Sequence, residues 1–166
     1  MLRIFFFLSV FLAVCSCKDG VSNTAETAES VWQVSMDSLP VKRSVLPKAQ
    51  QILNDWKEHT VLERSFDKIY TTEFREDLVL IIEELIENQK KMEAGEYPEA
   101  FNIPQIKGRQ KVFKTYLLKT KGDLEYRQNP QESLTEMIEA FNDLRNQFNV
   151  TVNNTLPDEL RSNEEN

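Results

Sequence analysis

Cysteine and histidine are scarce in this chain, and their scarcity excludes several kinds of site. The 166 residues include two cysteines, both within the first 17 positions, and one histidine, His59. A domain without cysteine beyond residue 17 has no disulfide there and no Cys-x-x-Cys-His motif for haem. With one imidazole, the chain also lacks the two Glu-x-x-His pairs of ferritin-like di-metal bundles. The domain must therefore be stabilised by its own hydrophobic core.

Glycine is also sparse, and no motif of a familiar catalytic chemistry is present. The four glycines form no phosphate-binding loop, and the chain has neither a Gly-x-Ser-x-Gly turn nor a His-Glu-x-x-His helix. Asp55, His59 and Glu63 share a helical face at i, i+4 and i+8. We interpret these three as solvated charge pairs and not as a metal site. We therefore expect no enzyme activity, no cofactor and no metal.

The chain is acidic, with a formal net charge of −7. Such a balance gives no general attraction to nucleic acid or to anionic lipid, so we expect no nucleic-acid partner. A length of 166 residues leaves room for one domain and little more.

The first 17 residues have the pattern of an export signal. Arg3 precedes an apolar run over residues 4–14 that only Ser9 interrupts. This run is too short to span a bilayer but has the length of a secretory signal. We therefore predict a signal peptide over residues 1–16. Its removal takes away one positive charge, Arg3, and changes the net charge from −7 to −8.

The end of this segment resembles the lipobox of bacterial lipoproteins. The frame that ends at Cys17 has a serine directly before the cysteine, whereas the frame that ends at Cys15 has a β-branched valine there. Cys17 is therefore the predicted lipidated residue, and Cys15 is the alternative. The resemblance implies a diacylglycerol on the thiol, a fatty acid such as palmitate on the amino group, and attachment to the membrane through this covalent lipid.

The next two residues add to this resemblance. Lys18 and Asp19 are similar to the start of the charged tract that marks surface export in Bacteroidota lipoproteins. The resemblance implies a location at the bacterial outer membrane, either periplasmic or exposed on the surface.

Composition divides the remainder of the chain into three parts. Residues 17–44 are rich in Ser, Thr, Ala, Asp and Glu and are predicted to form a flexible tether. An apolar patch at residues 31–34 interrupts the tether. We interpret it as a cover for a groove of the domain, the alternative being a partner-binding peptide. Residues 45–149 form the predicted helical domain, and residues 150–166 form a polar tail.

Apolar side chains recur at helical spacing through residues 45–149, which predicts an all-α fold, an up-down four-helix bundle. The first helix shows a slip in phase near His59, where it either kinks or gives way to a new helix. The second covers about residues 73–93 and should be the most buried, because its run at 79–82 is apolar around most of the circumference. No glycine or proline occurs at residues 70–72, so one long helix over 61–93 is an alternative.

The last two predicted helices have clearer limits. The third covers about residues 105–127. The fourth begins at Pro130, where Asn129 acts as the cap and a proline is tolerated in the first helical position.

The third predicted helix is basic. Four of its lysines fall within about 80° of one another at 100° per residue and form one stripe: Lys107, Lys111, Lys114 and Lys121. We favour the interpretation that this helix packs beside acidic neighbours, with ion pairs that select the arrangement of the bundle. The alternative is a face that binds an anion on a glycan, a lipopolysaccharide or an acidic protein.

The longest internal loop, residues 96–104, is a second candidate for binding. It presents Tyr97, Phe101 and Ile103 on a backbone that two prolines restrict. The alternative, and the more common use of such side chains, is to cover the open end of a bundle.

These patterns together predict a membrane-anchored envelope lipoprotein that acts as a binding module for an envelope protein or glycan. An alternative is a structural protein that forms a homo-oligomer through spare apolar surface on the second helix. A helical-bundle enzyme ranks last.

Overall fold

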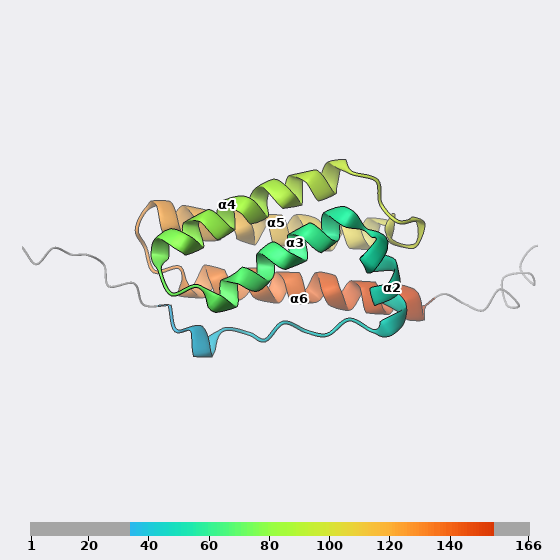
Figure 1. Cartoon of the computed structure of the whole chain (residues 1–166), viewed down its shortest axis with the longest axis horizontal. Coiled ribbons are helices and arrows are strands. Elements are labelled where there is room, and N and C mark those ends of the chain that lie inside the picture. Colours follow the sequence, from blue (N-terminus) through green and yellow to red (C-terminus); the bar gives the residue numbers. More distant parts are fainter. Residues whose placement is uncertain (1–33, 155–166) are drawn as a thin grey trace, which may run out of the picture. The chain divides into compact units, whose positions relative to one another are not determined.

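The structure is a computed structural model that describes residues 34–154. Within this range it contains helices and loops and no strand, so the prediction of an all-α bundle is confirmed. Five α-helices follow one another: α2 (Pro47–Asp55), α3 (Lys57–Asp67), α4 (Arg75–Ala94), α5 (Pro104–Glu125) and α6 (Gln131–Asn153). The last four run alternately up and down, each beside the next along the chain (Figure 1). No helix of the described part is long and apolar enough to cross a membrane.

The first predicted helix is two helices that one residue separates. Trp56 lies between α2 and α3 in an extended conformation, with φ −90° and ψ 93°. The hydroxyl of Thr60 donates to the Leu53 carbonyl at 3.3 Å and to the Trp56 carbonyl at 3.2 Å. These bonds satisfy backbone acceptors at the end of α2. The break therefore comes three residues before the slip in phase that the sequence shows at His59.

A turn separates α3 from α4, so the alternative of one helix over residues 61–93 is wrong. The chain passes from α3 into a 3-10 turn, η2 (Lys68–Thr71), and Thr72 after it is extended. Ile69 is fully buried, and the Tyr70 hydroxyl donates to the Pro40 carbonyl at 2.8 Å. Tertiary contacts thus hold a turn that contains neither glycine nor proline.

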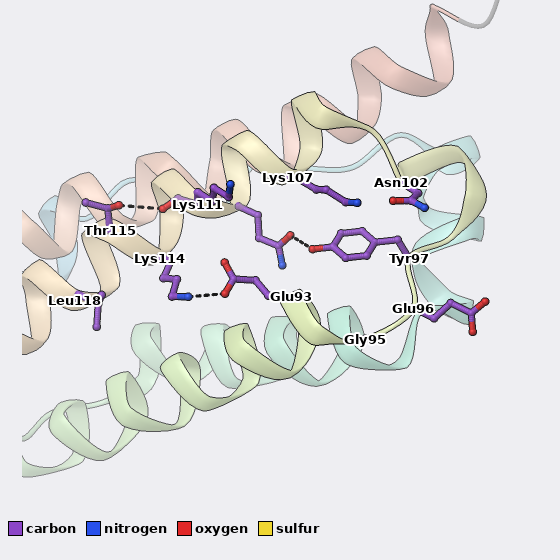
Figure 2. A pocket seen from close by; sticks show the side chains of 11 residues that line it. Glu93, Gly95, Glu96, Tyr97, Asn102, Lys107, Lys111, Lys114, Thr115 and Leu118 are labelled. Carbon is purple, nitrogen blue, oxygen red and sulfur yellow. Dashed lines mark hydrogen bonds and ion pairs between the residues drawn. The ribbon is translucent and has the colours of Figure 1, made fainter.

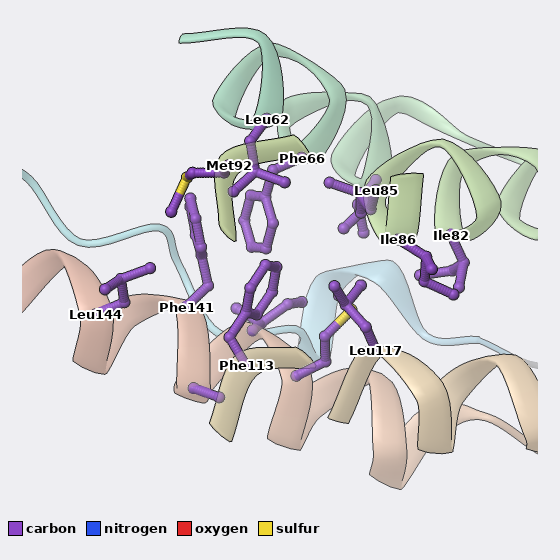
Figure 3. Close-up of a cluster of buried hydrophobic side chains, with 14 of the residues drawn as sticks. Leu62, Phe66, Ile82, Leu85, Ile86, Met92, Phe113, Leu117, Phe141 and Leu144 are labelled. Atoms are coloured by element: carbon purple, nitrogen blue, oxygen red, sulfur yellow. The ribbon is translucent and has the colours of Figure 1, made fainter. Parts of the chain in front are cut away.

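The centre of the bundle is filled by aromatic rings in contact and by aliphatic side chains around them (Figure 3). Phe66 of α3 stacks on Phe141 of α6 with ring centroids 4.0 Å apart, and Phe113 of α5 lies 5.0 Å from Phe141. All three side chains are fully buried, and α4 adds Leu85 and Ile82. Each aromatic pair stabilises the fold by about 0.5–1.5 kcal/mol beyond the area that it buries.

Residues 34–46 form an extended segment along α6, which we call the strap. Its backbone is held by side chains of that helix: the Arg43 amide donates to Asn142 Oδ1 and the Leu46 amide to Asn149 Oδ1, each at 2.8 Å. A 3-10 turn within it, η1 (Met36–Ser38), precedes Leu39, whose side chain is buried. The predicted tether over residues 17–44 therefore differs from the structure from residue 34 onward, because these residues are packed on the bundle.

Several predictions fall on residues that the structure does not describe. The signal peptide, Cys15, Cys17 and the start of the tether lie outside the described residues, as do residues 155–166 of the tail. Of the apolar patch at 31–34, only Val34 is described, and it packs against the core.

Arg145 of α6 joins the strap to α3. It is 4% exposed, its Nε donates to the Arg43 carbonyl at 2.6 Å, and its Nη1 donates to the Glu63 carboxylate of α3. Lys42 of the strap contacts the same carboxylate at 3.4 Å. Burial alone would raise the pKa of Glu63, but the charges of Arg145 and Lys42 outweigh it and hold that pKa below its usual value. Glu63 is therefore ionised at neutral pH and matches the buried guanidinium.

The prediction that the second helix is the most buried is wrong. α6 has 11 buried residues of 23, whereas α4 has 8 of 20 and leaves Leu80 64% exposed. The reason is the strap, which covers a face of α6 that would otherwise be in water, while no other segment of the described chain covers Leu80.

We expect Arg145→Met to lower the free energy of unfolding by about 3 kcal/mol, because the change leaves the Glu63 carboxylate without its buried partner. Urea denaturation measures the loss. The control is Arg109→Met, which removes an exposed pair with Asp143 and should cost no more than about 1 kcal/mol. Equal losses in the two variants would show that the buried contacts of Arg145 stabilise the fold no more than an exposed ion pair does.

Candidate functional site

An open groove lies between the C-terminal half of α4 and the N-terminal half of α5, beside the loop that joins them (Figure 2). We call it the α4–α5 groove. Its volume is about 930 Å³, and its lining includes Tyr97, Lys107, Gln110, Lys111 and Lys114. The stripe and the loop that the sequence singled out as separate candidates thus both contribute side chains to one surface.

The structure brings three of the four predicted lysines to this groove and places the fourth elsewhere. Lys107, Lys111 and Lys114 line it. Lys121 lies about two turns further along α5 and contacts Glu83 of α4 at 3.7 Å and Glu125 of its own helix at 3.4 Å. Lys121 is therefore part of the packing between α4 and α5.

Ion pairs connect α5 to acidic side chains on both neighbouring helices, as the structural interpretation of the stripe predicts. Lys114 contacts Glu93 of α4 at 2.5 Å. On the other side, Lys119 contacts Glu136 of α6 at 2.5 Å and Arg109 contacts Asp143 at 3.2 Å. These side chains are at least a quarter exposed, so each pair contributes about 0–1 kcal/mol and serves register more than stability.

Two cations of α5 behave differently. Within residues 34–154, neither Lys107 nor Lys111 makes an ion pair. Both are exposed and lie one helical turn apart on the rim of the groove. The packing account of the stripe therefore leaves these two charges unexplained.

Tyr97 forms one wall of the groove. Its ring lies against Trp56, with centroids 5.0 Å apart at 49°, and the Lys107 ammonium lies 5.0 Å from the Tyr97 centroid. The Tyr97 hydroxyl donates to Oε1 of Gln110 (Figure 2). Burial raises the pKa of this hydroxyl above its usual value, so it is protonated and remains a donor at neutral pH.

The other two loop residues do not reach the groove. Phe101 is fully buried, with its ring 4.7 Å from that of Phe148 of α6. Ile103 is partly buried against the core and precedes the first residue of α5. Both cover the end of the bundle, which is the alternative role that the sequence offered for them, and Tyr97 alone of the three lines the groove.

Gln110 is a groove residue that the sequence analysis missed. Its side chain is 1% exposed; Oε1 accepts from Tyr97, while the buried Nε2 has no partner among the described residues. Gln89 of α4 donates to the Gln110 carbonyl at 3.4 Å, and its own Oε1 is buried without a partner in the same range. The available signal was its spacing, since Gln110 falls between Ile106 and Phe113 on the inward face of the helix.

His59 is buried, so its interpretation as a solvated side chain is wrong. Its ring stacks on Trp56 at 5.9 Å and meets the edge of Phe148 at 5.4 Å. Neither ring nitrogen has a partner among the described residues, and burial lowers the pKa of His59 to about 4. Asp55 is exposed, and residues 34–154 contain no cluster of three His, Cys, Asp or Glu side chains that could hold a metal.

Comparison of the chain with known proteins finds no match among protein-family models, curated proteins or solved structures. The groove is therefore interpreted from its own residues.

The burial of His59 makes the stability of the bundle depend on pH. The pKa is about 4 in the folded chain against 6.5 for an ordinary histidine, so the unfolded chain takes up the proton first as the pH falls. Stability should be fully present above pH 6.5 and decrease by about 3 kcal/mol as the pH falls to 4.

The measurement is urea denaturation at several pH values, with His59→Phe as the control. The variant retains the aromatic packing and has no imidazole, so its stability should fall less over the same range. Identical pH profiles would mean that His59 is not the titrating group.

Proposed function

We propose that this protein is an envelope lipoprotein that binds an anionic ligand in the α4–α5 groove, and so acts as an interaction module. The observation that carries the proposal is the state of Lys107 and Lys111. The other four cations of α5 are Arg109, Lys114, Lys119 and Lys121, and each has an acidic partner. Two charges on one rim are thus available to a ligand.

The charge balance of the groove supports an anion. Three lysines and two carboxylates, Glu93 and Glu96, line it, which gives a local charge of +1 in a chain whose net charge is −7. One of these carboxylates, Glu93, already pairs with Lys114. A concave surface of locally positive charge concentrates anions even on an acidic protein. An envelope glycan or an acidic envelope protein would supply such an anion, and nucleic acid is not expected.

The membrane part of the proposal is supported by the sequence. The residues that end at Cys17 resemble a lipobox, and two or more acyl chains at about 0.8 kcal/mol per methylene hold a protein at a bilayer almost permanently. We propose the outer membrane as the location, with the bundle periplasmic or surface-exposed.

Cys17→Ser should abolish both labelling by a radioactive or clickable fatty acid and retention in the membrane fraction, because the acylated thiol is lost. Cys15→Ser is the matched control and should leave both unchanged. If Cys15→Ser loses the label while Cys17→Ser keeps it, the lipidated residue is Cys15; if both keep it, the lipoprotein proposal fails.

The double change Lys107→Glu plus Lys111→Glu should weaken binding of inorganic polyphosphate by about tenfold or more, corresponding to at least about 1.4 kcal/mol. Binding by the unaltered chain should also weaken as salt is added. Calorimetric titration measures both effects.

The control is Lys57→Glu plus Lys91→Glu. Both positions are exposed, neither lines the groove, and the change in net charge is the same. An equal loss in this control would show that polyphosphate responds to overall charge and not to the groove.

One observation favours a second candidate function, self-association. Leu80 of α4 and Phe74, which directly precedes α4, are 64% and 62% exposed, and a second copy of the chain could cover such apolar side chains. Sedimentation of the protein across a range of concentrations tests this second function. A chain that stays monomeric at every concentration would contradict self-association.

A further inference from the structure

The groove has neutral polar groups and an aromatic wall in addition to its charge. From these we infer that the ligand of the α4–α5 groove is an acidic saccharide, that is, a sugar that carries a carboxylate or a phosphate. The inference rests on the anion-binding function proposed above and names the class of ligand.

The buried amide of Gln110 fits a sugar hydroxyl. Gln110 lines the groove and is 1% exposed, and its Nε2 is a donor without a partner among the described residues. Gln89, which donates to the Gln110 carbonyl, does not line the groove. The oxygen of a sugar hydroxyl can accept from the Gln110 donor while its own O–H donates to another group.

The wall of the groove suits a sugar ring. The face of an aromatic ring is negative, and the Tyr97 ring already has the Lys107 ammonium 5.0 Å from its centroid. The C–H groups on one side of a pyranose carry a weak positive polarisation and can occupy the same kind of position. Lys107 is exposed on a flexible four-carbon stem, so it can move from the ring to an anionic substituent of the sugar.

The lysines then supply the site for the acidic group. Lys107 and Lys111 stand at i and i+4 on α5, a spacing that places their Cβ atoms about 5–6 Å apart, so both ammonium groups can reach one carboxylate or phosphate. Asn102 adds a neutral amide to the lining at the loop end. A volume of about 930 Å³ is at the upper end of the range for small-ligand sites and accommodates more than one sugar unit.

An acidic peptide would use the two lysines equally well. Its backbone carbonyls could also accept from the Gln110 amide, but its ionic side chains have no polarised C–H face for the Tyr97 ring, as a pyranose has. The aromatic wall of the groove therefore favours the saccharide.

The experiment uses the full chain, purified from membranes in detergent, and calorimetric titration with four probes. Trigalacturonic acid is a saccharide with three carboxylates, triglutamate is a peptide with three side-chain carboxylates, maltotriose is a neutral saccharide, and glucose 6-phosphate is a phosphorylated one. We expect trigalacturonic acid to bind at least about tenfold more tightly than triglutamate or maltotriose. A fifth probe, galacturonic acid, is compared with glucose 6-phosphate as a single sugar of the same size, and the comparison shows whether the acidic group is a carboxylate or a phosphate.

Two variants that leave the charge of the chain unchanged test the neutral part of the groove. Tyr97→Ala removes the wall, and Gln110→Met removes the amide while keeping a side chain of similar volume. Each should weaken the binding of trigalacturonic acid by about tenfold, and by clearly more than it weakens the binding of polyphosphate. Tyr97→Phe keeps the ring and should retain most of the saccharide affinity, which also guards against a variant that fails to fold.

Triglutamate binding as tightly as trigalacturonic acid would overturn the inference in favour of an acidic peptide. Saccharide affinity unchanged in both Tyr97→Ala and Gln110→Met would overturn it as well, because neither the aromatic wall nor the Gln110 amide would then contact the ligand. Neither result would contradict the proposed anion-binding function. That function fails if no anionic probe binds, or if Lys107→Glu plus Lys111→Glu leaves the binding of polyphosphate unchanged.

Discussion

The guanidinium of Arg145 is the constraint on which the arrangement of this bundle depends. It is the one charged side chain that is almost completely buried in the described chain, so each of its donors needs an acceptor. The acceptors come from two other segments, the Arg43 carbonyl of the strap and the Glu63 carboxylate of α3. These bonds fix where the strap lies on α6 and how α3 is turned toward α6. The stacked rings of Phe66 and Phe141 lie about one turn from Glu63 and from Arg145 on their respective helices, so the stacking depends on the same alignment.

Much of the helical architecture could be predicted from the sequence, because apolar periodicity and capping are local signals. The start of α6 is an example. The helix begins at Gln131, one residue after the predicted first position, and Asn129 Oδ1 accepts from the Gln131 amide at 3.0 Å. The strap could not be predicted in this way. Its backbone is held by the side chains of Asn142 and Asn149, about 100 residues away, and an extended segment on a polar helix face leaves no apolar period. The break in the first helix was predicted near His59 and lies at Trp56, since burial of the indole in the tertiary structure overrides the local helical pattern.

Only part of the groove could be predicted from the sequence. Lysine spacing on one helix placed Lys107 and Lys111 on one stripe, but which lysines have acidic partners depends on how α4 and α6 pack against α5. In the loop, Tyr97 and Phe101 look alike as aromatic residues near proline, and the structure assigns them opposite roles. The hydroxyl of Tyr97 donates to the side-chain oxygen of the buried Gln110 in the wall of the groove, whereas Phe101 has no polar side-chain atom and enters the core beside Phe148.

The direction of the strap has a consequence for where a ligand would meet this protein. The Ser35 amide donates to the side chain of Gln131, the first residue of α6, so the described chain starts at the end of the bundle where α5 gives way to α6. The loop between α4 and α5 is at the opposite end (Figure 1), and the groove lies beside that loop. From Lys107 to the end of α5 the helix rises roughly 27 Å, which is about three times the 8 Å over which salt screens charges at physiological ionic strength. Salt would therefore screen, at the groove, the charges of anionic groups that lie beyond the opposite end of the bundle, and the selectivity of the groove would be set by molecules near its own end.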